Sequence, residues 1–485
     1  MTEPTVLLTY AVRHRVIIKY LGQLAGMLAI LALAPLLASI IYSEYEATLR
    51  YAVVITGLTV AALIARRQPV PASIQNNEAL CITALAFMLS PLIMVYPIMA
   101  SGLSATDALF ESISAVTTTG LTTLVTVQNM PDTFLFARAW MQWYGGLGIV
   151  VLSIALLMQS GIVTRQLVDS VSNESALTTT RSYAKRMFKV YVGLTVAGFL
   201  GLWLILPDGF QALTHTLAAI STGGFSSLDH SLASLDGWPA RFAVMFIGLL
   251  GAVPFALYSR AAAGNWKRLF TDSEFLTLLT ATIVIGLLLT WTFQTGDSRP
   301  WSENLGHAML MSLSAQTTTG YASLDINGLD NTAKLLLIIA MLCGGGVGST
   351  AGGIKLLRLL ILARLVLLLI QRSAMPSHAV SQITLGNRPL ESDDIVRTLV
   401  LILMFIIVIL LSWLLFLAYG YAPLDSLFEV VSAVGTVGLS TGITRPGLET
   451  VLKIVLELDM LLGRLEILAL LIVLYPRTWF GNRIT

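Results

Sequence analysis

The chain has 485 residues, of which 56% are hydrophobic and only 12% are charged, and its mean hydropathy of +0.80 lies far outside the range of soluble globular proteins. A formal net charge of +2 is too small to indicate a nucleic-acid partner, and the two cysteines, Cys81 and Cys343, lie in apolar segments that suggest neither a disulfide framework nor a Cys-x-x-Cys site. These values predict an integral membrane protein surrounded by lipid, without a nucleic-acid partner.

Ten apolar runs of membrane-spanning length follow one another along the chain. A bilayer core about 30 Å thick needs roughly 20 apolar residues per helix, so each run predicts one transmembrane helix. Their cores are Leu21–Tyr42, Leu49–Ala65, Leu80–Met99, Phe134–Met158, Phe188–Leu206, Phe242–Tyr258, Phe275–Phe293, Leu335–Ile370 (interrupted), Leu399–Tyr419 and Leu452–Leu474. The first run is long and lacks a clear small-x-small cleavage site, so we expect a retained helix rather than a signal peptide.

Lysine and arginine in the connecting loops predict the orientation, because such residues are retained on the cytoplasmic side. With the N-terminus inside, the basic stretches from Arg181 to Lys189 and from Arg260 to Arg268 are cytoplasmic, and the outer loops receive far fewer basic residues. We therefore expect both termini on the cytoplasmic side.

A short pattern, small-Ala-x-x-Thr-x-Gly, recurs four times between these runs. The copies read SAVTTTG (Ser114–Gly120), AAISTGG (Ala218–Gly224), SAQTTTG (Ser314–Gly320) and SAVGTVG (Ser432–Gly438). Each copy ends a half-apolar stretch of about ten residues, which is too short to cross a bilayer. The four stretches are therefore predicted to be re-entrant.

Each stretch is predicted to be a half-helix that enters from the outer side and ends at Thr-x-Gly. DALFESISAV at 107–116 and DSLFEVVSAV at 425–434 are near copies, each with a capping-type aspartate. The C-terminal end of such a helix favours a cation, and the extended backbone beyond it must be buried in protein or line a pore, because lipid cannot satisfy its carbonyls.

Four such segments around one axis predict a ring of carbonyl oxygens that replaces the water shell of a weakly hydrated alkali cation. Aligned by glycine, one layer holds Thr118, Thr222, Thr318 and Thr436, and the layer two residues above holds Gly120, Gly224, Gly320 and Gly438. For a single copy, close helix packing through small residues is an equal alternative. Four copies in matching positions favour the ring.

On these motifs the whole chain resembles the Trk/Ktr/HKT superfamily of potassium transport proteins, and within it the bacterial TrkH/TrkG-type uptake subunits. The resemblance implies an all-α integral membrane protein of the bacterial inner membrane, in which four helix–pore loop–helix repeats surround a central ion pore. By this resemblance residues 1–70 form an N-terminal hairpin, and residues 71–165, 166–265, 266–375 and 376–485 form the repeats.

The resemblance assigns a potassium selectivity filter to the four Thr-x-Gly segments: Thr118, Thr119, Gly120, Thr222, Gly223, Gly224, Thr318, Thr319, Gly320, Thr436, Val437 and Gly438. Glycine at all four key positions is the family pattern associated with potassium, whereas serine in the first is linked to sodium permeation. The second copy reads Ser-Thr-Gly-Gly and the fourth Gly-Thr-Val-Gly, so the quarters are not chemically identical and a perfect fourfold site is not expected.

The eighth apolar run is broken by CGGGVGSTAGGIK, Cys343 to Lys355. So many glycines cannot hold a regular helix, at roughly 1 kcal/mol each relative to alanine, so we expect a flexible intramembrane loop below the third filter segment. A simple packing break is the alternative. The resemblance implies a gating loop, with these gate residues: Gly344, Gly345, Gly346, Gly348, Ser349, Thr350, Gly352, Gly353 and Lys355, joined by Arg464 from the last span.

Arg464 resembles the arginine that TrkH-type proteins direct into the pore, where its charge opposes cation leak. The alternative is a structural ion pair with an acid such as Glu466 or Asp459, since charges at membrane depth are costly. Both roles are compatible.

The leading hypothesis is potassium translocation through a channel-like subunit, with K⁺ as the transported ion and no organic cofactor. A symporter coupled to protons or sodium, and the potassium-binding subunit of a primary pump, remain alternatives. No nucleophile, metal cluster or acid pair suggests an enzyme. The resemblance further implies a homodimer controlled by a cytoplasmic nucleotide-binding TrkA-type subunit.

Overall fold

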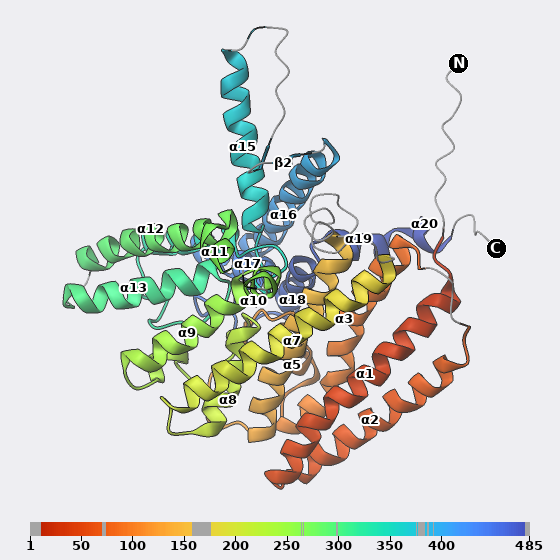
Figure 1. The fold of residues 1–485 in the computed structure, drawn as a ribbon. Helices are drawn as coiled ribbons and strands as arrows, with labels where there is room; N and C mark the ends of the chain where they lie inside the picture. Colours follow the sequence, from red (N-terminus) through yellow and green to blue (C-terminus); the bar gives the residue numbers. More distant parts are fainter. Residues whose placement is uncertain are drawn as a thin grey trace.

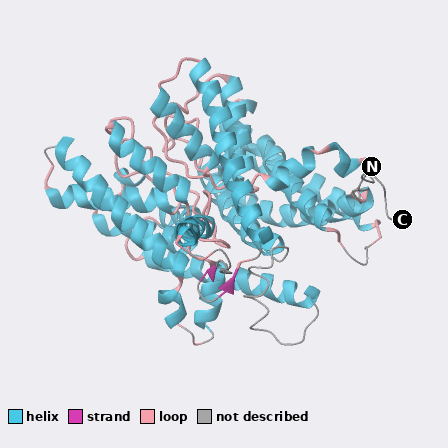
Figure 2. Ribbon diagram, turned by 90° about the horizontal axis from the view of Figure 1, so that it is seen from above, coloured by secondary structure: helices cyan, strands magenta, loops and turns pink. Residues whose placement is uncertain are grey.

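The computed structural model describes residues 11–69, 74–157, 176–262, 264, 266–296, 299–374, 376, 384–385, 388–390 and 392–480. Helices dominate this part of the chain, and the strands within it, β1 (Thr384–Leu385) and β2 (Arg388–Pro389), form one short antiparallel pair (Figure 2). The predicted all-α fold is therefore confirmed.

The first two helices, α1 (His14–Ile41) and α2 (Tyr45–Arg66), form an antiparallel hairpin at one edge of the molecule (Figure 1). The hairpin is close-packed: a β-carbon added at Gly22 would lie less than 3.0 Å from the Ala65 side chain. Trp140 on a later helix donates to the Leu31 carbonyl at 2.8 Å and ties the hairpin to the rest of the protein.

The chain then repeats one order of elements four times: an outer helix, a shorter pore helix that ends at a Thr-x-Gly segment, and an inner helix. The outer helices are α3 (Asn76–Ile98), α7 (Ala176–Trp203), α12 (Ser273–Gly296) and α16 (Ser392–Ala418). The pore helices are α4 (Ala105–Val116), α8 (Gly209–Ile220), α13 (Trp301–Gln316) and α17 (Pro423–Val434). The inner helices are α5 (Asp132–Leu157), α9 (Trp238–Ala252), α14 (Asn331–Cys343) and α18 (Thr450–Arg464).

The remaining elements complete the described chain. They are η1 (Met99–Ser101), η2 (Ser231–Ser234), α10 (Phe255–Ala262), α11 (Lys267–Thr271), α15 (Leu356–Ser373), α19 (Leu468–Leu474) and α20 (Pro476–Trp479). In Figure 1, α15 projects away from the helical body, on the side where α20 also lies. Val12 donates to the Thr478 carbonyl at 2.9 Å, and His14 stacks on Trp479, so the two ends of the described chain adjoin on one side.

Helices occupy each of the ten predicted apolar runs. Among the described residues, α1, α2, α3 with η1, α12 and α16 are long and apolar enough to cross a membrane, and α9 with α10 qualifies as a bent pair. This confirms the multi-pass character, while the full count of ten crossings stays a prediction.

The structure breaks two of the runs that the sequence predicts as single spans. The run Phe242–Tyr258 bends by 89° between α9 and α10, where Pro254 lacks the amide that a continuing helix needs. The run Leu452–Leu474 is broken between α18 and α19, where Glu466 and Ile467 have φ of 53° and 62°. Both breaks lie beside the glycine-rich loop. Amides of this loop donate to the carbonyls at the end of α9, which have no partner within the helix.

Candidate functional site

All four pore helices end in the same backbone geometry. In each, the amide of the threonine in Thr-x-Gly donates to the carbonyl three residues earlier, and the next amide donates to the carbonyl five residues earlier. In the first segment, these bonds run from Thr118 to Ala115 at 3.0 Å and from Thr119 to Ser114 at 2.9 Å. This is the Schellman ending of an α-helix, whose left-handed position is usually glycine. Here that position is threonine four times: Thr118, Thr222, Thr318 and Thr436 have φ of 55°, 51°, 53° and 49°.

A left-handed threonine is unfavourable because its side chain is branched at the β-carbon. Such strain, about 1–3 kcal/mol per residue, persists where the surrounding structure enforces it and clusters at functional sites. Two residues later the backbone is left-handed again, at glycines with φ of 74° to 97°. The residue between does not share this conformation, so the backbone alternates in hand and turns successive carbonyls to one side.

The four segments form a closed ring. A β-carbon added at each filter glycine would lie less than 3.0 Å from a carbonyl oxygen of the next segment: Gly120 from Gly223, Gly224 from Thr319, Gly320 from Val437, and Gly438 from Thr119. The last contact returns to the first segment, so every filter glycine touches its neighbour and the order is cyclic. The ring predicted from the sequence is therefore present as a contact pattern, and no side chain fits at these glycines.

The layer of threonine hydroxyls lies at the end of the ring that faces the glycine-rich segment. These four threonines are at most 1% exposed. Within the described residues, the Thr118 and Thr436 hydroxyls have no hydrogen-bond partner, whereas Thr222 donates to the Ser221 carbonyl at 2.7 Å. Because a buried polar group without a partner is costly, the two free hydroxyl oxygens suit a ligand that accepts lone pairs, namely a dehydrated cation.

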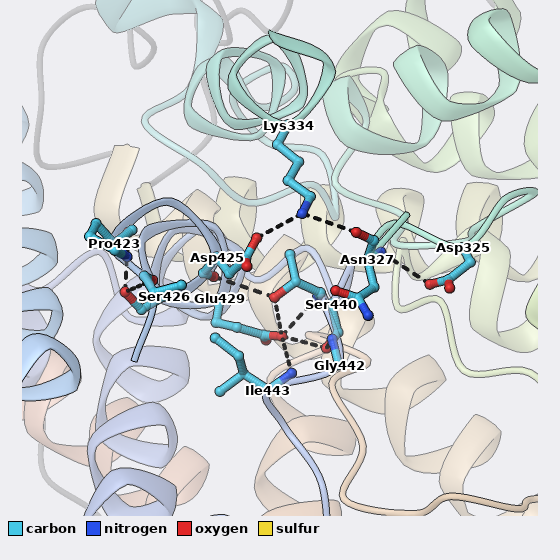
Figure 3. A network of polar contacts seen from close by, with 12 residues as sticks. Asp325, Asn327, Lys334, Pro423, Asp425, Ser426, Glu429, Ser440, Gly442 and Ile443 are labelled. Atoms are coloured by element: carbon cyan, nitrogen blue, oxygen red, sulfur yellow. Dashed lines mark hydrogen bonds and ion pairs between the residues drawn. The ribbon is translucent and has the colours of Figure 1, made fainter. Parts of the chain in front are cut away.

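A buried residue on each pore helix, nine positions before the filter glycine, supports the segment that leaves the filter. These residues are Glu111, His215, Met311 and Glu429. Glu111 bonds to Thr122 and Thr123, His215 to Ser226, Met311 to Ser323, and Glu429 to Ser440 and Thr441. The same support is thus built from four different side chains. Figure 3 shows the Glu429 carboxylate receiving several of these bonds, including one from the Ile443 amide at 3.2 Å. His215 therefore belongs to this support.

Contacts between neighbouring quarters hold the outer rim. Lys334 on α14 pairs with Asp425 on α17 at 2.8 Å (Figure 3), and Lys453 on α18 pairs with the equivalent Asp107 on α4 at 2.7 Å. The two aspartates therefore join quarters and do not cap their helices: Ser104 caps α4, and α17 has no side-chain cap.

The loops that follow the Thr-x-Gly segments of the first two quarters are tied to each other outside the membrane-spanning helices. The Gln128 and Val127 amides donate to the Asp229 carboxylate, and these bonds hold its pKa below the usual aspartate range.

The glycine-rich segment crosses the face of the ring at which the pore helices end. The Thr350 hydroxyl bonds to the last carbonyl of the second pore helix, Ile220, at 3.1 Å, and the Gly353 amide bonds to Gly435 at the end of the fourth at 3.1 Å. In a cyclic order these two quarters face each other. Between them, the Gly352 amide donates to the Thr318 hydroxyl of the filter at 2.7 Å, so the segment lies directly below the ring.

The ends of this segment are anchored from the surrounding helices. The α9 break leaves the carbonyls of Gly251 and Ala252 free to accept from Thr350 and Gly346 at 3.1 and 3.2 Å. The carboxylate of Glu274 on α12 accepts from the Val347 amide at 2.7 Å.

Arg464 reaches the same segment and donates to the Thr350 carbonyl at 2.8 Å. It is 3% exposed. The acids considered as its partners are engaged elsewhere: Glu466 pairs with Arg358 and Asp459 accepts from Ser412 at 2.7 Å. Among the described residues no acid pairs with Arg464, and its hydrogen-bond partners are the backbone carbonyls of Thr350 and, at 3.5 Å, Gly145. Lys355, at the end of the loop, donates to the Ala351 carbonyl within the loop.

All twelve predicted filter residues thus lie in one ring, and the predicted gate residues lie beneath it. The sequence reasoning missed Arg138, Gln142 and Glu274, which support the ring or the loop from other helices. Arg138 pairs with Glu111 at 3.0 Å and lies over the Phe225 ring at 3.7 Å. A buried polar side chain in an apolar run is the only signal that could have found these residues.

Comparisons with known proteins agree with this geometry. Residues 53–477 match the TrkH family, described as cation transport protein. The chain is 32% identical over 483 residues to the Trk system potassium uptake protein TrkI of Halomonas elongata, and 30% identical over 468 residues to an uncharacterized cation transporter of Methanocaldococcus jannaschii, each comparison covering 96% of both chains. The crystal structure of the potassium transporter TrkH from Vibrio parahaemolyticus superposes with a TM-score of 0.87 at 26% identity, covering 96% of this chain and 100% of that one.

Proposed function

The chain belongs to the TrkH family of cation transport proteins and carries potassium across a membrane, and we propose that the ion passes through the ring of four Thr-x-Gly segments. The protein is a multi-pass membrane transporter and not an enzyme. The observation that carries the proposal is the cyclic contact of the four filter glycines with the carbonyls of their neighbours.

The ring is suited to potassium because carbonyl and hydroxyl oxygens replace the water of a large, weakly hydrated cation more completely than that of a small one. The carbonyls come from Thr118, Thr119 and Gly120 and their counterparts in the other quarters, and the free hydroxyls of Thr118 and Thr436 add ligands at the inner end. The C-terminal ends of the four pore helices meet at this layer and favour a cation there.

The glycine-rich segment acts as the gate. It is bonded to the second, third and fourth quarters, so an ion leaving the ring inward meets its backbone. Glycine lowers the cost of changing between two backbone arrangements, and a gate needs arrangements separated by only a few kcal/mol. Arg464 holds the blocking arrangement and adds a positive charge that opposes a cation.

Two copies of the chain form the transporting unit, and a cytoplasmic TrkA-type subunit controls it. The support is α15, which projects from the body (Figure 1) and exposes apolar side chains such as Val366, Leu369 and Ile370 at 51%, 65% and 62%. An exposed apolar helix of this kind indicates a contact with lipid or with another protein, and its projection out of the helical body favours a second chain. The bacterial inner membrane, with both termini cytoplasmic, is the location that the basic loops favour.

Flux measurements in vesicles that contain the purified protein test the proposed pathway. We expect potassium and rubidium to pass and sodium and lithium to be excluded. Equal passage of sodium and potassium would contradict the ring as the selective element. Reversal potentials measured under opposed proton and sodium gradients separate a channel-like pathway, whose potential follows potassium alone, from a coupled symporter.

A further inference from the structure

We propose that Gln142, on the first inner helix α5, positions the second filter segment and thereby helps to set ion preference. This inference rests on the proposed ion pathway. Gln142 is fully buried. Its side-chain amide donates to the Gly223 carbonyl, and its side-chain oxygen accepts from the Phe225 amide at 3.2 Å, so it holds the second segment at two points on either side of Gly224.

In the first and fourth segments, a serine hydroxyl of the same quarter bonds to backbone groups of the segment. In the first, Ser114 accepts from the Gly120 amide at 3.1 Å and donates to the Leu121 carbonyl at 2.6 Å. In the fourth, Ser432 accepts from the Gly438 amide at 3.0 Å.

In the first and third segments, two threonine hydroxyls also pair with each other, at 2.8 Å between Thr117 and Thr119 and at 2.7 Å between Thr317 and Thr319. The second segment has Ala218 in place of the serine and Gly223 in place of the second threonine. It therefore carries neither hydroxyl, and Gln142 bonds to this segment from a different quarter, at the Gly223 carbonyl and the Phe225 amide.

The volumes of the paired residues are complementary. A β-carbon added at Gly223 would lie less than 3.0 Å from three atoms of the Gln142 side-chain amide, so the glutamine fills the space of the absent side chain. At the next interface the sizes are exchanged: Gly248 on α9 faces Thr319, and a β-carbon at Gly248 would lie 2.8 Å from the Thr319 hydroxyl oxygen. Gln142 and Gly248 occupy equivalent positions on their inner helices. Each lies three residues before a glycine, Gly145 or Gly251, that packs on the last carbonyl of a pore helix.

Gln142 is a positioning residue, because it acts on the ion through the Gly223 carbonyl. A net hydrogen-bond contribution of about 0.5–1.5 kcal/mol corresponds to roughly a two- to tenfold change in an equilibrium. Losing this bond frees one carbonyl of the ring to move, and we expect the potassium-over-sodium permeability ratio to fall by that factor.

The test measures bi-ionic reversal potentials of the full-length protein in vesicles, together with its thermal stability. Gln142→Glu replaces the donor by an oxygen of the same shape and should lower the ratio, as should Gln142→Gly. Gly223→Thr alone should also lower it or abolish conduction, because the introduced side chain overlaps Gln142. The double variant Gln142→Gly with Gly223→Thr reproduces the Gly248 and Thr319 arrangement and should recover most of the ratio.

Trp143→Phe is the matched control. It removes a buried hydrogen bond of the neighbouring residue, from the Trp143 indole to Thr195 at 3.0 Å, without touching the ring, and should leave the ratio unchanged. A wild-type ratio in folded Gln142→Glu, or a double variant no better than its worse parent, overturns the proposal. If Gln142→Gly does not fold, the double variant must still fold and conduct, or the proposal fails. A wild-type protein without potassium preference would instead overturn the proposed function itself.

Discussion

Replacing Arg464 by alanine is expected to raise basal cation flux without changing ion preference. The arginine donates to the Thr350 carbonyl at 2.8 Å, and a hydrogen bond from a charged donor contributes about 1.5–3 kcal/mol. A loss of about 2 kcal/mol shifts the ratio of blocked to open loop by roughly 30-fold, because 1.4 kcal/mol is a factor of ten. Removing the positive charge acts in the same direction.

Single-pore recordings measure this shift as a rise in open probability, and the reversal potential reports ion preference in the same experiment. Arg464→Lys separates the two causes, because it keeps the charge but shortens the reach and loses the planar donor group. We expect an intermediate open probability for the lysine variant. Unchanged open probability in a folded alanine variant would refute the reasoning, as would altered selectivity.

Replacing Gly120 by serine should admit sodium, because the new β-carbon overlaps the Gly223 carbonyl at a residue whose φ is 89°; a bi-ionic potential that stays at the wild-type value would contradict this. Glu274→Gln weakens the bond that holds the Val347 amide by about 1 kcal/mol and should therefore raise the open probability several-fold in single-pore recordings. An unchanged open probability would show that Glu274 does not anchor the loop. Lys453→Met removes an ion pair between the fourth and first quarters and should lower thermal stability while conduction by the folded protein stays potassium-selective; an unchanged melting temperature would show that this rim contact contributes little.

The ring could be predicted from the sequence because its signal is a repeat. One Thr-x-Gly copy has an ordinary packing explanation, whereas four copies at matching positions between apolar runs require a common structure. The near-identity of 107–116 and 425–434 also marked the pore helices. The pattern could not show that the threonines are left-handed, because that conformation follows from the Schellman bonds at each helix end.

The contacts that hold the ring could not be predicted, because they join residues far apart in the sequence and differ from quarter to quarter. The support behind the filter is a glutamate, a histidine, a methionine or a second glutamate, which no single motif describes. The broken inner helices were also missed, since hydropathy is continuous through Pro254, and the charged Arg464 and Glu466 were interpreted as side chains on one helix. Arg464 and its neighbouring acids allowed two pairings, and the fold alone selected the loop carbonyl.

The bi-ionic reversal potential of the purified protein, with potassium on one side and sodium on the other, tests the central claim most directly. If the cyclic ring of Thr-x-Gly segments selects the ion, the potential lies far toward the potassium equilibrium value, rubidium can replace potassium, and an imposed proton gradient leaves the potential unchanged. A potential near zero, with sodium and potassium equally permeant, would contradict the claim.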